Sequence, residues 1–157
     1  MSDELFVPEG FTVPDGLTAG EFWLAPLGPQ HNESDYAAWT ASLGHIRATP
    51  GFGGGSWPRE MSLDDNLRDL ERHARDFAGR RGFTYTVLST GTGDVIGCVY
   101  IYPPSGHKPD GTGVRRAAVS SWVRADRAAL DPVLHDAVLA WLERDWPFDS
   151  VEYAPRA

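Results

Sequence analysis

The stretch AVSSWVRADRAALDPVLHDAVLAWL, residues 118–142, predicts a strand, a turn and a helix in succession. The apolar run Val119–Val123 is typical of a buried strand, and residues 124–130 form a short basic turn. We expect a helix from Pro132 with Asp131 as its N-cap, because Asp accepts hydrogen bonds from free first-turn N–H groups and Pro suits the first helical position. The apolar residues that follow recur at helical spacing: Val133, Leu134, Ala137, Val138, Trp141 and Leu142. A strand that turns into a helix N-terminus is a common place for an α/β protein to hold a phosphorylated cofactor.

The rest of the chain predicts further strands and helices around this unit. The expected strands are residues 22–27, 83–88, 95–102 and 150–153, and the expected helices run from a cap at Asn32 to about Arg47 and from a cap at Ser62 to about Gly79. A tight turn at 91–94 makes the central strands antiparallel, and the helical crossover makes the last strand parallel to its neighbour. Residues 103–113 are expected to form a loop. Residues 1–20, interrupted by Pro and Gly, predict an extended arm on the surface or a disordered tail.

Composition narrows the class of protein. The 157 residues suit one domain, and a formal charge of −8 argues against nucleic acid as a partner, which requires a basic face. The single Cys98 excludes an internal disulfide and fits a reducing cytoplasm. We find no signal peptide and no apolar run near the ~20 residues that a membrane span needs. The sequence therefore predicts a cytoplasmic protein that does not bind membranes.

The glycine-rich run ATPGFGGGSWPRE, residues 48–60, resembles a phosphate-binding loop only superficially. It lacks the Gly-Lys-Ser/Thr ending of such loops, and no helix opens directly from it. We interpret it as a mobile loop beside a binding cleft, with Trp57 available to line a substrate pocket.

The order of the predicted elements resembles the GNAT family of N-acetyltransferases. The segments that carry the resemblance are FWLAPLGPQHNESDYAAW (22–39), GDVIGCVYIYPP (93–104) and VSSWVRADRAALDPVLHDAVLAWL (119–142). The resemblance implies a GNAT-like acyltransferase domain over residues 21–157. Its α/β fold would have a mixed, mainly antiparallel twisted sheet with helices on both faces and without the family's last hairpin. It also implies acetyl-CoA or another acyl-CoA as co-substrate, bound where the fourth and fifth family strands separate.

The implied cofactor site departs from the family pattern. The positions that would contact the cofactor are Trp122, Val123, Arg124, Arg127, Ala129 and Leu130. Ala129, Leu130 and Asp131 fall near the Gly-x-Gly of the family. As an N-cap, Asp131 would occupy amides otherwise offered to phosphate, and two like charges at 4 Å repel by about 1 to 4 kcal/mol. Arg124 and Arg127 could offset this repulsion. The alternative interpretation is therefore a GNAT-like binding or assembly module that has lost acyl-CoA binding.

Acylation of an amine requires a base, a donor for the developing oxyanion and an acid for the leaving thiolate. The family geometry implies Glu152 as the base, with an exposed strand carboxylate as the alternative. We expect Ser121, rather than Ser120, to face the cleft. Tyr102 could supply an acidic phenol, although Tyr100 and Tyr102 are also explained as core aromatics.

The acceptor side of the predicted cleft is assigned to Phe52, Trp57 and His45, and the expected acceptor is a small-molecule amine. His45 and His73 each flank a helix stripe, which favours a boundary position over the role of a base. The histidines form no cluster with Asp or Glu, so no metal site is predicted. An unpaired edge on the last strand suggests a homodimer, which a strictly monomeric sedimentation profile would exclude.

Overall fold

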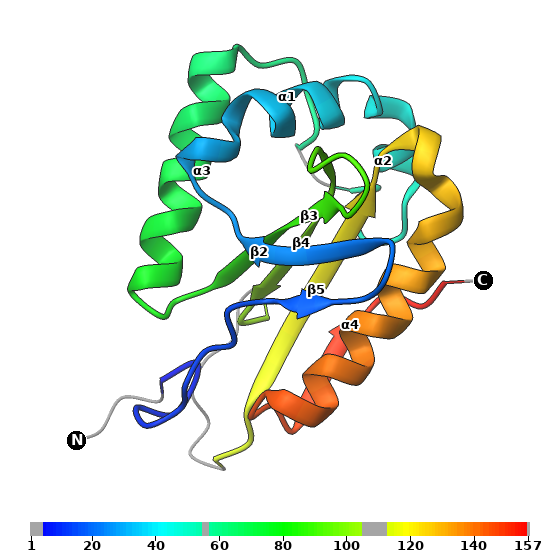
Figure 1. Ribbon diagram of the computed structural model, residues 1–157. Coiled ribbons are helices and arrows are strands. Elements are labelled where there is room, and N and C mark those ends of the chain that lie inside the picture. Colours follow the sequence, from blue (N-terminus) through cyan, green and yellow to red (C-terminus); the bar gives the residue numbers. More distant parts are fainter. Residues whose placement is uncertain (1–4, 55–56, 105–112, 157) are drawn as a thin grey trace.

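The computed structural model describes residues 5–54, 57–104 and 113–156. Its centre is a six-stranded sheet in the order β1-β2-β3-β4-β5-β6 (Figure 1). The strands are β1 Leu17–Thr18, β2 Phe22–Pro26, β3 Phe83–Ser89, β4 Val95–Tyr102, β5 Arg116–Val123 and β6 Ser150–Tyr153. Neighbours from β1 to β5 are antiparallel, whereas β5 and β6 are parallel. The predicted fold class is confirmed, and β5 begins three residues before the expected Val119.

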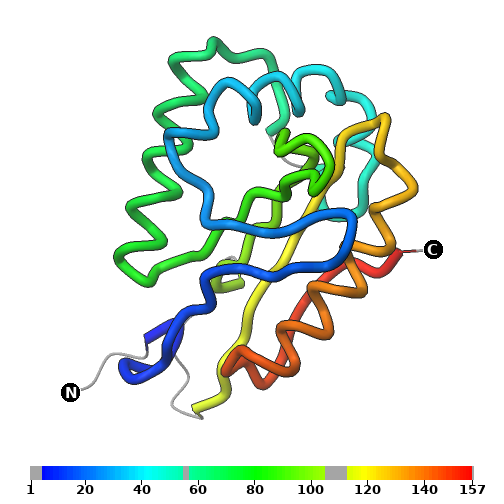
Figure 2. Tube along the Cα trace, viewed as in Figure 1, coloured from blue at the N-terminus to red at the C-terminus, as the bar shows by residue number. Residues whose placement is uncertain are grey.

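Helices cover both faces of this sheet, as the trace in Figure 2 shows. The α-helices are α1 Asn32–Thr40, α2 Leu43–Ala48, α3 Leu63–Ala78 and α4 Asp131–Asp145, and the short 3-10 helices are η1 Pro29–His31 and η2 Ala125–Leu130. α1, α2 and α3 lie over one face, and α4 crosses the other between β5 and β6. The two faces therefore provide two separate layers in which a side chain can lie.

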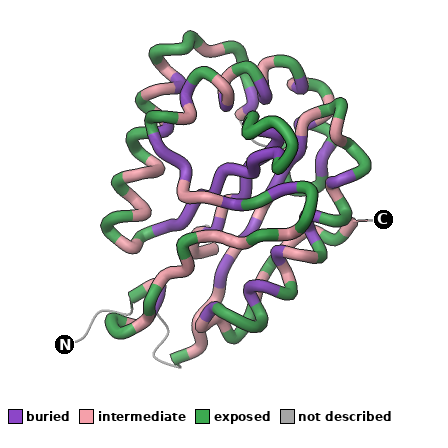
Figure 3. Tube along the Cα trace, viewed as in Figure 1, coloured by how far each residue is buried: buried purple, intermediate pink, exposed green. Residues whose placement is uncertain are grey.

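Each face of the sheet has its own apolar core, and Figure 3 shows the buried positions along the strands. Under α4, Leu134 and Trp141 pack on odd-numbered residues of β5 such as Val119. Under α1–α3, Trp39 packs in a second cluster with Trp122 of β5. The strict alternation along β5 decides which residues can reach each side, because successive strand side chains point to opposite faces.

The segment before β1 is part of the packed structure over residues 5–16. Val7 is only 1% exposed, and the hydroxyl of Tyr85 donates to the carbonyl of Pro14 at 2.7 Å. The guanidinium of Arg80 donates to the carbonyls of Pro8 and Phe11. This part of the predicted arm lies on the sheet and leads into β1, whereas residues 1–4 lie outside the described residues.

Two predicted helix boundaries need correction. The helix expected from Asn32 to Arg47 ends at Thr40 and restarts at Leu43 as α2. Asn32 is not a cap, because its amide donates to the carbonyl of Leu63 and accepts from Asn66. By contrast, the cap at Ser62 is confirmed: its hydroxyl accepts from the N–H of Asp65 at 3.0 Å. Of the loop predicted at 103–113, residues 105–112 lie outside the described residues, as do residues 55–56 of the glycine-rich run.

Candidate functional site

The strands β5 and β6 pair over only part of the length of β5. Their register runs from Arg116↔Ser150 to Val119↔Tyr153, and the described residues show no β5–β6 pair beyond this point. β5 itself continues to Val123 in register with β4, where Gly97 lies opposite. The last four residues of β5 thus have one strand neighbour instead of two, and α4 begins after the turn that follows them.

The start of α4 differs from the prediction. The helix begins at Asp131, its N-cap residue is Leu130, and no side chain caps it. The carboxylate of Asp131 instead accepts a hydrogen bond from Nε of Arg156 at 2.6 Å. Asp131 cannot act as the N-cap, because it has helical φ and ψ (−57° and −52°) and continues directly from the preceding 3-10 helix. The predicted competition of Asp131 for the first-turn amides is therefore absent.

The turn between β5 and α4 is the 3-10 helix η2. Ala125 donates its N–H to the hydroxyl of Ser42 at the start of α2. Arg124 is paired with Asp126 through two hydrogen bonds of 2.9 Å. Arg127 makes no side-chain hydrogen bond or ion pair with the described residues, so its guanidinium is available to a ligand.

An open groove lies on the α3 side of the sheet, beside the end of the β5–β6 pairing. Gly51, Tyr100 and Ser120 line both halves of this groove. The half next to β6 is also lined by Tyr102, Ala118 and Glu152, and the half next to α3 by Phe52, Trp57, Asp69, Arg72 and His73. Carboxylates and aromatic rings therefore share one surface.

The alternation of β5 places the two serines of the strand on opposite faces. Ser120 lies opposite Tyr100 and faces the groove. Ser121 is fully buried on the α4 side, where its hydroxyl lies 2.5 Å from the hydroxyl of Tyr153. The expectation that Ser121 faces the cleft lined by Tyr102 is not met, because the two residues differ by an odd number of positions in the paired register.

A hydrogen-bonded chain of side chains runs behind the groove. The hydroxyl of Tyr102 donates to Oδ2 of Asp76 at 2.9 Å and lies 3.0 Å from Nδ1 of His73. The hydroxyl of Thr84 lies 2.9 Å from the same nitrogen. Burial, with the nearby positive charge of Arg72, lowers the pKa of His73 to about 4, and burial raises the pKa of Tyr102 to about 12. At neutral pH His73 is uncharged and Tyr102 keeps its proton.

Several solved structures with a similar arrangement of strands and helices are acetyltransferases. A ribosomal-protein-S5-alanine acetyltransferase from Vibrio fischeri superposes with a TM-score of 0.62 at 9% identity, over 81% of this chain and 66% of that one. The microcin C7 self-immunity acetyltransferase MccE, in complex with acetyl-CoA and AMP, gives 0.62 at 13% identity, over 83% and 66%. A Bordetella pertussis protein assigned to the GNAT family of acetyltransferases gives 0.58 at 16% identity, over 83% and 74%.

This chain has the GNAT fold. The predicted resemblance is confirmed at the level of the fold, and the match spans about two thirds of the length of the first of these solved chains. No protein-family model matches the sequence, and a search of curated proteins finds no match.

Within the GNAT fold, the structure brings some of the predicted site residues together and separates others. Glu152 and Tyr102 line the half of the groove next to β6, and Phe52 and Trp57 line the other half. His45 does not line it; Nε2 of this side chain is buried without a hydrogen-bond partner in the described parts of the chain.

The residues predicted for the cofactor lie along β5 and η2. Trp122 and Val123 are buried on opposite faces of β5, and Leu130 is also buried. Ala129 is exposed beside it. Trp122 and Val123 lie in the length of β5 that β6 leaves unpaired, and only their backbone groups lie along this open edge. Their contribution to a cofactor site would therefore be through peptide groups.

Tyr100 and His73 are two of the groove residues to which the sequence analysis assigned no role in the site. Nε1 of Trp122 donates to the hydroxyl oxygen of Tyr100 at 3.0 Å, and the same hydroxyl shares a hydrogen bond with the buried thiol of Cys98. Burial raises the pKa of Tyr100 well above its usual value. In the described residues no group of three or more His, Cys, Asp or Glu side chains is arranged to hold a metal ion. None of the described helices combines the length and apolarity that crossing a bilayer requires.

Proposed function

We propose that this protein is an acyl-CoA-dependent N-acyltransferase that transfers an acetyl or related acyl group to a small amine. The observation that carries the proposal is the end of β5–β6 pairing at Val119↔Tyr153, next to a helix start without a side-chain cap. The solved acetyltransferases that share the fold support the same class of chemistry, and one of them is a complex with acetyl-CoA.

The chain offers a seat for the diphosphate of such a co-substrate at the start of α4. The dipole of α4 attracts anions to this end of the helix, where the N–H of Asp131 is donated to the carbonyl of Ala128 and Pro132 has no N–H. Arg127 supplies a free guanidinium in the same turn, and Arg124 a second one that is paired with Asp126. Without a ligand, the negative charge of Asp131 is offset by its ion pair with Arg156.

Acyl-CoA supplies an acyl carbon activated as a thioester, and the groove would supply the base. The carboxylate of Glu152 would take a proton from the ammonium, so that the amine nitrogen can form its bond to the acyl carbon. As the carbon–sulfur bond breaks, the leaving thiolate would take up a proton from solvent; the role of acid does not suit the hydroxyl of Tyr100, which is engaged by Trp122 and Cys98. Tyr102 is less suited to this role than expected, because its proton is already donated to Asp76.

The lining of the groove favours an acceptor amine that carries an apolar or aromatic group. Phe52 and Trp57 present rings about 6 Å apart, and aromatic faces attract ammonium groups. His73 is neutral at physiological pH because its pKa is about 4, so it does not repel a cation. Glu152 and Asp69 add negative charge to the two halves of the groove.

Thermal unfolding with CoA esters tests the co-substrate. A ligand present at 100 times its Kd adds about 2.7 kcal/mol of stability, which corresponds to about 5 to 10 °C in the midpoint for a chain of this size. We expect this shift with acetyl-CoA and not with ATP at equal concentration, since ATP is anionic but lacks the pantetheine arm. If no CoA ester at millimolar concentration shifts the thermal midpoint, the proposal is contradicted.

A further inference from the structure

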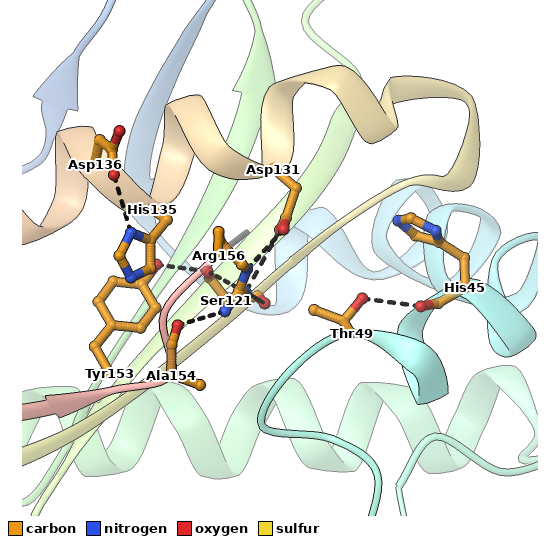
Figure 4. A network of polar contacts seen from close by, with 9 residues as sticks. All are labelled: His45, Thr49, Ser121, Asp131, His135, Asp136, Tyr153, Ala154 and Arg156. Atoms are coloured by element: carbon orange, nitrogen blue, oxygen red, sulfur yellow. Dashed lines mark hydrogen bonds and ion pairs between the residues drawn. The ribbon is translucent and has the colours of Figure 1, made fainter.

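Arg156 is the most completely enclosed charged side chain next to the unpaired length of β5. Its side chain is 5% exposed, and it donates from Nε to Oδ2 of Asp131 at 2.6 Å. Nη2 donates to the carbonyl of Ser121 at 2.9 Å, and Nη1 donates to the carbonyl of Ala154 at 2.8 Å. Figure 4 shows the guanidinium between these three residues.

The guanidinium lies where β6 would continue if it paired with β5 beyond Tyr153. Ser121 is the second residue of β5 beyond the last pair, Val119↔Tyr153, and its carbonyl accepts from a side chain instead of from strand backbone. The same side chain reaches the first residue of α4. Arg156 thereby closes the space between β5 and the helix start from the β6 side.

Side-chain contacts alone hold this closure in place. In the described residues, no backbone hydrogen bond joins 154–156 to β5, whereas β6 itself stays paired as far as Tyr153. Release of the Arg156 side chain therefore leaves the sheet intact. Its energetic cost is the loss of the buried charge pair and of the bond to the Ser121 carbonyl.

We propose that Arg156 is a latch that acyl-CoA must displace in order to bind between β5 and β6. This inference rests on the proposed function, because the displacing ligand is the co-substrate of that reaction. A ligand that binds only the open state has its apparent affinity reduced by the open fraction, so a mutation that removes the latch raises the affinity.

The sharpest test removes both charges of the latch. Arg156→Ala alone leaves the carboxylate of Asp131, whose side chain is 16% exposed, without its partner. The double variant Arg156→Ala/Asp131→Asn avoids this unpaired charge. We expect it to bind acetyl-CoA at least tenfold more tightly, in calorimetry, than both the native protein and Asp131→Asn, which removes the same negative charge and keeps Arg156. The matched control is Arg144→Ala/Asp145→Asn, which removes an exposed pair at the other end of α4 and should leave Kd unchanged.

The possible results separate the latch from the proposed function. If native protein binds acetyl-CoA and the double variant binds no more tightly than native protein or than Asp131→Asn, the latch is wrong and the function stands. If neither protein binds, both are wrong, since the opened site should then accept the ligand.

A measurement on the native protein does not depend on how the variant folds. The Nε–H of Arg156, assigned by comparison with Arg156→Lys, should exchange with solvent at least tenfold faster in NMR spectra once acetyl-CoA saturates the protein. Unchanged exchange in the saturated complex overturns the latch.

Discussion

Replacing Glu152 with Gln is expected to lower kcat/KM for amine acylation by about 100-fold or more, because general base catalysis contributes about 10²–10⁴-fold. Glu152 is exposed on β6 and lines the groove with Tyr102 and Ser120. Gln keeps the shape of the side chain and cannot remove a proton from an ammonium. Steady-state kinetics of thiol release should therefore show the loss in kcat, with Kd for acetyl-CoA unchanged in calorimetry.

Glu143→Gln is the matched control for this variant. Glu143 is an exposed carboxylate on α4, away from the groove lining, and its replacement should change kcat/KM less than twofold. The thermal midpoints of both variants should match that of the native protein. If Glu152→Gln retains kcat/KM within threefold of native, another group is the base.

Replacing Asp35 with Asn is expected to stabilise the protein above pH 7, by up to about 3 kcal/mol. Asp35 is 5% exposed on α1, and its carboxylate accepts from the amide of Asn66 at 3.1 Å. Burial raises its pKa from 3.8 to about 6, which this hydrogen bond partly opposes and the negative charge of Asp69 increases. The folded state therefore favours the protonated acid.

The sign of the pH dependence follows from this raised pKa. In the native protein the contribution of Asp35 to the free energy of unfolding is fully present below about pH 4. It is lost as pH rises through about 6, and above that the buried charge has a constant cost. Urea unfolding of Asp35→Asn should lack this decline, whereas the exposed control Asp64→Asn should keep it. The same slope in Asp35→Asn and native protein would show that Asp35 is not the titrating group.

Local signals in the sequence were sufficient for most elements of the fold. The Ser62 cap depends on a residue three positions away, and the hairpin of β3 and β4 depends on a tight turn, so both are fixed by near neighbours. The break between α1 and α2 was not predictable in this way. Leu43 and Ile46 continue the apolar spacing of Tyr36 and Trp39, while the hydroxyl of Ser42 is used by Ala125, more than eighty positions along the chain.

The site depends on contacts that spacing along the chain does not reveal. Asp131 before Pro132 is typical of an N-cap, but in the structure it continues helically from η2 and its carboxylate pairs with Arg156, 25 residues away. His73 carried a detectable signal: it lies three residues after Leu70 and four before Phe77, which places it on the sheet-facing side of α3. The face of Ser121 followed from the alternation of β5 once its register with β4 was known.

The measurement that tests the central claim most directly is release of free CoA thiol from acetyl-CoA in the presence of a panel of small amines, with the acylated amine quantified by mass spectrometry. The account predicts thiol release that depends on both the protein and the amine, equals the acylated amine mole for mole, and is greatest for amines with an apolar or aromatic group. Tight acetyl-CoA binding without amine-dependent thiol release for any member of the panel would contradict it.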